Sequence, residues 1–170
     1  TWYAAERFLA DDPALARAND ALIQLLGAHD PLPAVVIDSQ WKLLHMNRGA
    51  QWLAATLLPW AAALPTGSPM NMLDLFIHPE GLTEKTVNLN EVGPAMLAHL
   101  REDATTEPAL EPKVQAFAAI LSERLGGQAA QGGLPRSVAP VLTTRFATEH
   151  GELAFFSMFT TFGAPQDITL

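Results

Sequence analysis

Apolar residues recur at helical spacing near the start of the chain. The positions that share one helical face are Leu15, Ala18, Leu22, Leu25 and Leu26. Asp12 followed by Pro13 is a typical helix start, because the carboxylate accepts free amide hydrogens and proline suits the first helical position. Gly27 commonly ends such a run. The pattern predicts a helix from about residue 13 to residue 26.

Two pairs of short apolar, β-branched runs lie near the two ends of the chain. The first pair covers residues 34–37 and 41–46, with polar residues between them. The second pair covers residues 141–146 and 153–162, and Glu149-His150-Gly151-Glu152 supplies the reversal. Each pair predicts an antiparallel hairpin.

Helical spacing returns between the two hairpins, and an asparagine precedes each of three helical runs. Asn47, Asn71 and Asn90 can each accept the first free amide hydrogens of a helix, the second helix being a short turn over 72–77. A fourth helix is predicted after Glu111-Pro112. The residues expected to face inward are Ala50, Leu53, Leu57, Leu58, Val92, Met96, Leu97, Leu100, Val114, Phe117, Leu121 and Leu125.

The order of these elements predicts an α+β fold, with residues 1–170 forming one domain. We expect the N- and C-terminal hairpins to join in one antiparallel sheet, covered by several helices. The glycine-rich stretch 126–135 is predicted to be a flexible connector. Sheet and helices would enclose a concavity with an apolar lining.

Composition and charge narrow the function. The 170 residues are 49% hydrophobic, enough for a core that buries roughly 70% of the surface of the unfolded chain. The net charge of −8 is the wrong sign for binding nucleic-acid phosphates. The absence of cysteine excludes disulfides and thiol chemistry and fits the cytoplasm. No apolar run is long enough to span a membrane, so we expect no membrane partner.

Catalytic and metal-binding motifs are not evident. The histidines are scattered, without the spacing that places two on one metal, so no metal or other cofactor is expected. No Gly-x-Ser-x-Gly nucleophile motif occurs. We expect a protein that is not an enzyme; the alternative is a small enzyme with His45 or His78 as general base.

A family resemblance sharpens this interpretation. Residues 33–50 contain an apolar strand, Asp38, Trp41, and then Asn47 three residues before Ala50. Further matching blocks are 71–82, 87–92, 151–163 and 167–170. This pattern resembles the MmyB-like ligand-binding domain of bacterial XRE-type helix-turn-helix transcription regulators, and its opening strand pair is similar to that of PAS sensor domains.

The resemblance implies a PAS-like sheet and a sensory role. The ligand would be a small apolar molecule such as a fatty acid, and DNA would be contacted only through an N-terminal helix-turn-helix domain outside this chain. We expect residues 1–12 to be the remnant of the linker to that domain, a last strand to follow Leu170, and the regulator to be a homodimer. The alternative is a dimerisation module with a filled core and no ligand, using helix 13–26 as its partner surface.

The apolar side chains of the hairpins and helices are the candidate ligand contacts. The proposed lining is Trp41, Leu43, His45, Asn47, Met72, Phe76, Phe117, Phe146, Phe156 and Met158. Strand parity is open, so Leu44 and Phe155 can replace their neighbours. Helix capping is the first role of Asn47, ahead of ligand contact. Arg48 and Arg145 are candidate partners for an acidic head group; the alternative, which is the ordinary role of a surface arginine, is that both are simply exposed to solvent.

Overall fold

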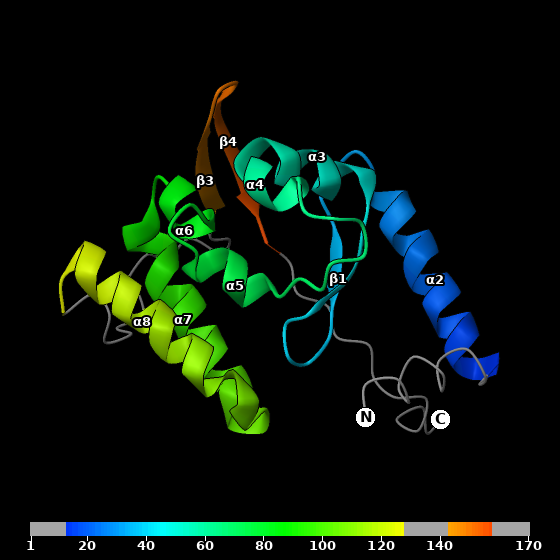
Figure 1. Cartoon of the computed structure of the whole chain (residues 1–170), viewed down its shortest axis with the longest axis horizontal. Helices are drawn as coiled ribbons and strands as arrows, with labels where there is room; N and C mark the ends of the chain where they lie inside the picture. The colour runs from blue at the N-terminus through cyan, green and yellow to red at the C-terminus, as the bar shows by residue number, and fades with distance from the viewer. Residues whose placement is uncertain (1–12, 128–142, 158–170) are drawn as a thin grey trace.

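The computed structural model describes residues 13–127 and 143–157, and these form a mixed helical and stranded fold (Figure 1). The helices are α2 (Pro13–His29), α3 (Arg48–Leu57), α4 (Pro59–Ala62), α5 (Met72–Ile77), α6 (Leu82–Lys85), α7 (Leu89–Thr106) and α8 (Glu111–Leu125), with a 3-10 turn at Pro108–Leu110. The strands are β1 (Val35–Ile37), β2 (Leu43–Met46), β3 (Thr143–Thr148) and β4 (Gly151–Phe156). The predicted α+β class is confirmed.

Both hairpins form, but the prediction that they share one sheet is wrong within the described residues. There β1–β2 and β3–β4 are two separate two-stranded antiparallel sheets. The segments that flank the short helices pair with strand edges that the two hairpins would have needed to join in one sheet. Leu43 N donates to Met70 O on one hairpin, and Val87 N donates to Arg145 O on the other. The helical insertion therefore satisfies backbone groups that a common sheet would have used.

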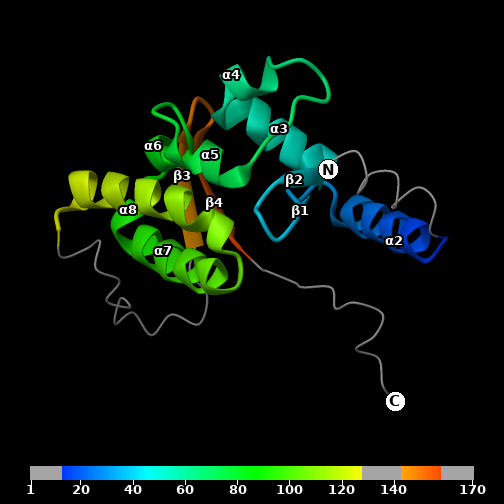
Figure 2. The ribbon, with the colours of Figure 1, turned by 60° about the horizontal axis from the view of Figure 1, so that its bottom comes forward.

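Helices α5, α7 and α8 enclose the larger of two cores, here called the main core. Figure 2 shows α7 and α8 side by side. Leu97, Leu100 and Leu121 are fully buried there, and the predicted inward faces of both helices are confirmed. A Cβ on Gly93 would lie 2.7 Å from Leu121 Cδ2, so this glycine permits the close approach of α7 and α8.

A second core lies between α3, α4 and α5. Its buried members are Leu57, Leu58, Ala61 and Leu75. Leu53 is partly buried against this core, as is Phe146 of β3. The late hairpin is thereby anchored to the helices by an apolar side chain, in addition to the backbone bonds at its edge.

The asparagines fulfil two of the three capping predictions. Asn47 Oδ1 accepts from Ala50 N at the start of α3, and Asn71 Oδ1 accepts from Leu73 N at the start of α5. The cap predicted at Asn90 is wrong, because α7 begins at Leu89 and its N-cap is Asn88. The buried Asn88 side chain donates to Thr143 O and accepts from Arg145 N, and so holds β3 to the start of α7.

Helix α2 lies at the edge of the molecule in both ribbon views (Figures 1 and 2). It continues through Gly27 to His29, farther than predicted. Among its described side chains only Leu26 is buried. Over the described part of the chain, no helix combines the length and apolar character required to cross a membrane.

Candidate functional site

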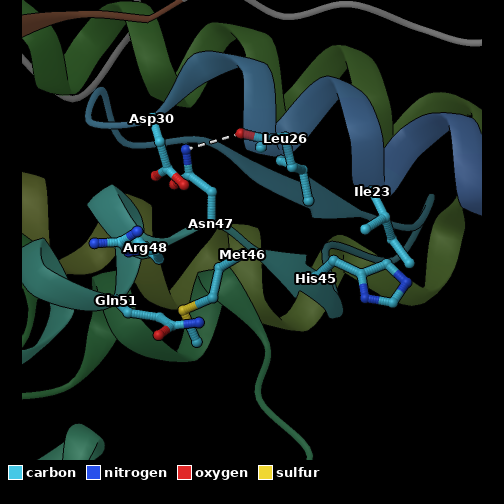
Figure 3. A pocket seen from close by; sticks show the side chains of 9 residues that line it. Ile23, Leu26, Asp30, His45, Met46, Asn47, Arg48 and Gln51 are labelled. Carbon is cyan, nitrogen blue, oxygen red and sulfur yellow. Dashed lines mark hydrogen bonds between the residues drawn. The ribbon is translucent and has the colours of Figure 1, made fainter.

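An open pocket of about 270 Å³ lies between α2, the end of β2 and the start of α3 (Figure 3). Its lining residues are Ile23, Leu26, Gly27, Asp30, His45, Met46, Asn47, Arg48 and Gln51. Ile23, Leu26 and Met46 supply apolar surface, and the other side chains are polar or charged. The pocket therefore combines an apolar strip with hydrogen-bonding groups, as small-molecule sites do.

Asn47 organises this region. Its Oδ1 accepts from Ala34 N and Ala50 N, both at 2.9 Å. Its Nδ2 donates to Leu26 O at 3.1 Å and to Leu32 O at 2.8 Å. These bonds use the full capacity of an amide side chain. Asn47 joins the end of α2, the following loop and the start of α3, and thus shapes the pocket wall.

Two neighbours complete the connection, which we call the α2–α3 junction and define by Asp30, Asn47 and Gly49. Gly49 N donates to Asp30 Oδ1 at 3.0 Å. A Cβ on Gly49 would lie 2.2 Å from Pro31 O, so the loop after α2 can approach α3 only at a glycine. The junction fixes the distance between the end of α2 and the first turn of α3.

The two ends of the pocket carry different polar side chains. In Figure 3, Arg48 and Gln51 lie at one end, and His45 and Ile23 lie at the other. His45 Nε2 lies 2.9 Å from Asn19 Oδ1, at hydrogen-bond distance. Arg48 is exposed and its guanidinium makes no hydrogen bond or ion pair within the described residues. Arg48 is thus available to an anion.

Several predicted ligand contacts lie in the main core. Trp41 is 4% exposed and Phe117 is 2% exposed. The ring of Phe76 lies between them, with centroids 6.3 Å from Trp41 and 6.0 Å from Phe117. Met72 packs against both cores. The structure places these four side chains in or against the main core, which they help to stabilise.

Trp41 is held in an unusual conformation. Its φ of 61° is in the left-handed region, which is rare for a bulky residue. Its Nε1 donates to Asp103 Oδ2 at 2.8 Å, and its carbonyl oxygen accepts from Met72 N at 2.8 Å. These contacts attach the turn between β1 and β2 to α5 and α7.

The remaining predicted contacts are dispersed. Phe146 and Phe155 share a face of the late hairpin with ring centroids 6.3 Å apart, whereas Phe156 is on the opposite face and 61% exposed. Leu43 is half-buried and Leu44 is 48% exposed. Met158 lies outside the described residues. Of the predicted set, the pocket contains His45 and Asn47.

The histidines considered as general bases have structural contacts. His78 Nδ1 accepts from Glu80 N at 3.0 Å, and its ring stacks on Trp60 with centroids 3.8 Å apart. His45 is bonded to Asn19, as described above. Within 13–127 and 143–157, no three acidic or histidine side chains gather as metal ligands would.

Sequence reasoning missed the contribution of α2 to the pocket. Ile23, Asp30 and Gln51 were not candidates, because helical periodicity does not reveal which strand a helix packs against. One sequence signal could have located this pocket: Asp30 follows the first helix, and Asn47 and Gly49 stand at the start of the next one. An acidic residue after a helix and an asparagine before the next one are both typical of side chains that bond to backbone.

Residues 18–170 match the family described as the MmyB-like transcription regulator ligand binding domain. Comparisons with curated proteins and with solved structures gave no match.

Proposed function

Because the chain belongs to the family of MmyB-like transcription regulator ligand binding domains, we propose that it senses an amphiphile of the fatty-acid type in the pocket between α2 and α3. Family membership supports a ligand-sensing regulator domain and not an enzyme. In our proposal, the acidic head of the ligand lies at Arg48, and its apolar chain lies along Ile23, Leu26 and Met46.

The exposed guanidinium of Arg48 beside an apolar strip is the observation that carries this proposal. An arginine offers a planar fork of donors that suits a carboxylate. Asp30 also lines the pocket, but its Oδ1 already accepts from Gly49 N. About five methylenes leaving water would contribute about 4 kcal/mol. That is enough to bias a two-state equilibrium if the ligand prefers one state.

The proposed output is DNA binding by another part of the regulator. With a net charge of −8, this chain is unsuited to contacting nucleic acid itself. We assign DNA contact to an N-terminal helix-turn-helix domain of the longer regulator, acting in the cytoplasm. Helix α2 both lines the pocket and leads toward the N-terminus of the chain, so it is the element that would transmit the bound state.

Calorimetry with three ligands of equal chain length tests the head group. We expect decanoate to bind more tightly than 1-decanol, and Arg48→Gln to weaken decanoate about tenfold while leaving 1-decanol unchanged. Arg101→Gln is the matched control, because Arg101 is an exposed arginine on α7. Tighter binding of decyltrimethylammonium than of decanoate would instead identify Asp30 as the head-group partner and overturn the proposal.

The other location considered for the alkyl chain of the ligand is the main core, among Trp41, Met72, Phe76 and Phe117. Phe76→Ala distinguishes the two locations. If the ligand lies in the α2–α3 pocket, this variant loses stability but keeps its decanoate affinity. If Phe76→Ala lowers the affinity for decanoate and Ile23→Ala leaves it unchanged, the ligand lies in the main core and not in the α2–α3 pocket.

A homodimer is the second candidate role, supported by one face of α2. Ala18, Ala21, Leu25 and Ala28 follow the alternating three- and four-residue spacing of a helix–helix seam, and all four are exposed. A second copy of the chain would cover this seam. Light scattering after size exclusion tests it: Leu25→Glu should give a monomer, and Gln24→Glu, also on α2 and exposed, should not change the mass.

A further inference from the structure

We propose that the hydrogen bond between Asn19 and His45 is a latch, that the α2–α3 junction is a pivot, and that ligand entry opens the latch and swings α2. This inference rests on the proposed function in one respect, that binding of the ligand causes the movement. The latch and the pivot themselves rest on contacts within the chain.

The pivot is the most strongly bonded end of α2. Asn47 Nδ2 donates to Leu26 O, and Leu26 is the one buried side chain among those described on α2. Gly49 N holds Asp30 just beyond the last turn, and the Pro31 backbone lies against Gly49 without room for a Cβ. This end cannot move away from α3 without breaking several bonds together.

The latch is a single contact farther along the same helix. Asn19 precedes Leu26 by seven residues, which is about 10 Å of helix. Within the described residues, no other side chain of α2 makes a hydrogen bond or an ion pair. Ile23, between latch and pivot, is 46% exposed. Among the described side chains of this part of α2, one hydrogen bond to β2 and the partly buried Leu22 therefore provide the attachment.

The pocket lies between these two attachments. Ile23, Leu26 and Gly27 line it from α2, and His45 and Met46 line it from β2 (Figure 3). An alkyl chain that enters between Ile23 and Met46 buries more surface if α2 moves outward. The ligand thus prefers the open latch, which is the differential affinity that a switch requires. The movement is largest at the end of α2 nearest the N-terminus.

The lack of cysteine allows two spin labels to be placed without background. Arg17→Cys on α2 and Ala119→Cys on α8 are both exposed positions, and the two helices lie on opposite sides of the molecule (Figure 1). Pulsed electron paramagnetic resonance then measures the distance between the labels. Decanoate should shift the mean distance by on the order of 3 Å, as a modest rotation about the junction requires.

Removing the latch should reproduce part of this change without ligand. Asn19→Ala and His45→Phe each remove one partner, and each should broaden the distance distribution or shift it toward the decanoate-bound value. Asp20→Ala is the matched control, because Asp20 is an exposed neighbour of Asn19 on α2 and should leave the distribution unchanged. Circular dichroism verifies that each variant retains the helical content of the parent.

The outcomes separate the latch from the proposed ligand. Unchanged distributions in both latch variants overturn the latch. Calorimetric binding of decanoate with no change in label distance also overturns it, and leaves the proposed function intact. A changed distribution in the latch variants with no binding of decanoate supports the latch and overturns the proposed ligand.

Discussion

The main core and the α2 region are stabilised by different interactions. In the main core, Leu97, Leu100 and Leu121 are completely buried, and α7 approaches α8 closely at Gly93. In the α2 region, Ile23 and Leu25 are nearly half exposed, and polar bonds at the α2–α3 junction provide most of the attachment. One region is held by dense apolar packing and the other by a small number of directional hydrogen bonds.

This difference indicates which part of the fold can respond to a ligand. A close-packed interior has few alternative arrangements of low energy, so a ligand cannot enter it without a large cost. A helix attached by a few hydrogen bonds can open locally while the rest remains folded. In the proposed function, the main core is the scaffold and the α2 region is the element that a bound ligand would move.

Leu97→Ala should have the largest effect on stability. Leu97 is fully buried in the main core, so the substitution creates a cavity and lowers the free energy of unfolding by about 3 kcal/mol. Urea denaturation measures this loss. Decanoate affinity of the folded variant should remain that of the parent, and a parallel loss of affinity would show that the two regions are not independent.

Asn47→Asp should cost about 2 kcal/mol, since it keeps the cap oxygen but leaves Leu26 O and Leu32 O without a donor beside a new negative charge. Asn71→Asp is the comparison variant and should cost less, because it keeps the cap of α5 and loses one donated hydrogen bond, to Gln40 O, whereas Asn47→Asp loses two at a buried side chain. The same urea experiment compares the two variants. Equal losses would contradict the special role assigned to the junction.

Trp41→Phe should lower the free energy of unfolding by about 1.5 kcal/mol, because it removes the hydrogen bond from Nε1 to the Asp103 carboxylate but retains a ring in the main core. A double-mutant cycle with Asp103→Ala isolates the contribution of this bond. If the coupling free energy is close to zero, the Nε1 bond does not anchor the turn between β1 and β2, which is then held by the buried ring and by the backbone bond from Met72 N to Trp41 O.

Ile23→Ala should have the smallest effect on stability, about 0.5 kcal/mol, because the side chain is 46% exposed. Decanoate affinity should nevertheless fall about threefold, since the lost methylene groups no longer contact the ligand. Calorimetry and denaturation on the same sample give both values. A stability loss as large as that of Leu97→Ala would remove the contrast between the two regions.

Local sequence signals determined the elements with good accuracy. Asn47 and Asn71 stand directly before helices, and the alternation of turn residues and β-branched runs located both hairpins. The inward faces of α7 and α8 follow from helical periodicity. These properties depend on residues within one or two turns of each other, so the sequence contains the information directly.

The tertiary structure decided how those elements meet. Sequence reasoning placed Trp41, Phe76 and Phe117 around a cavity, whereas the structure packs them together in the main core. Within residues 13–127 and 143–157 the two hairpins form separate sheets, and helical connections occupy edges that a common sheet would have used. The pocket between α2 and α3 depends on which face of β2 the first helix covers. Periodicity shows that a face is apolar, but only packing in three dimensions shows what covers it.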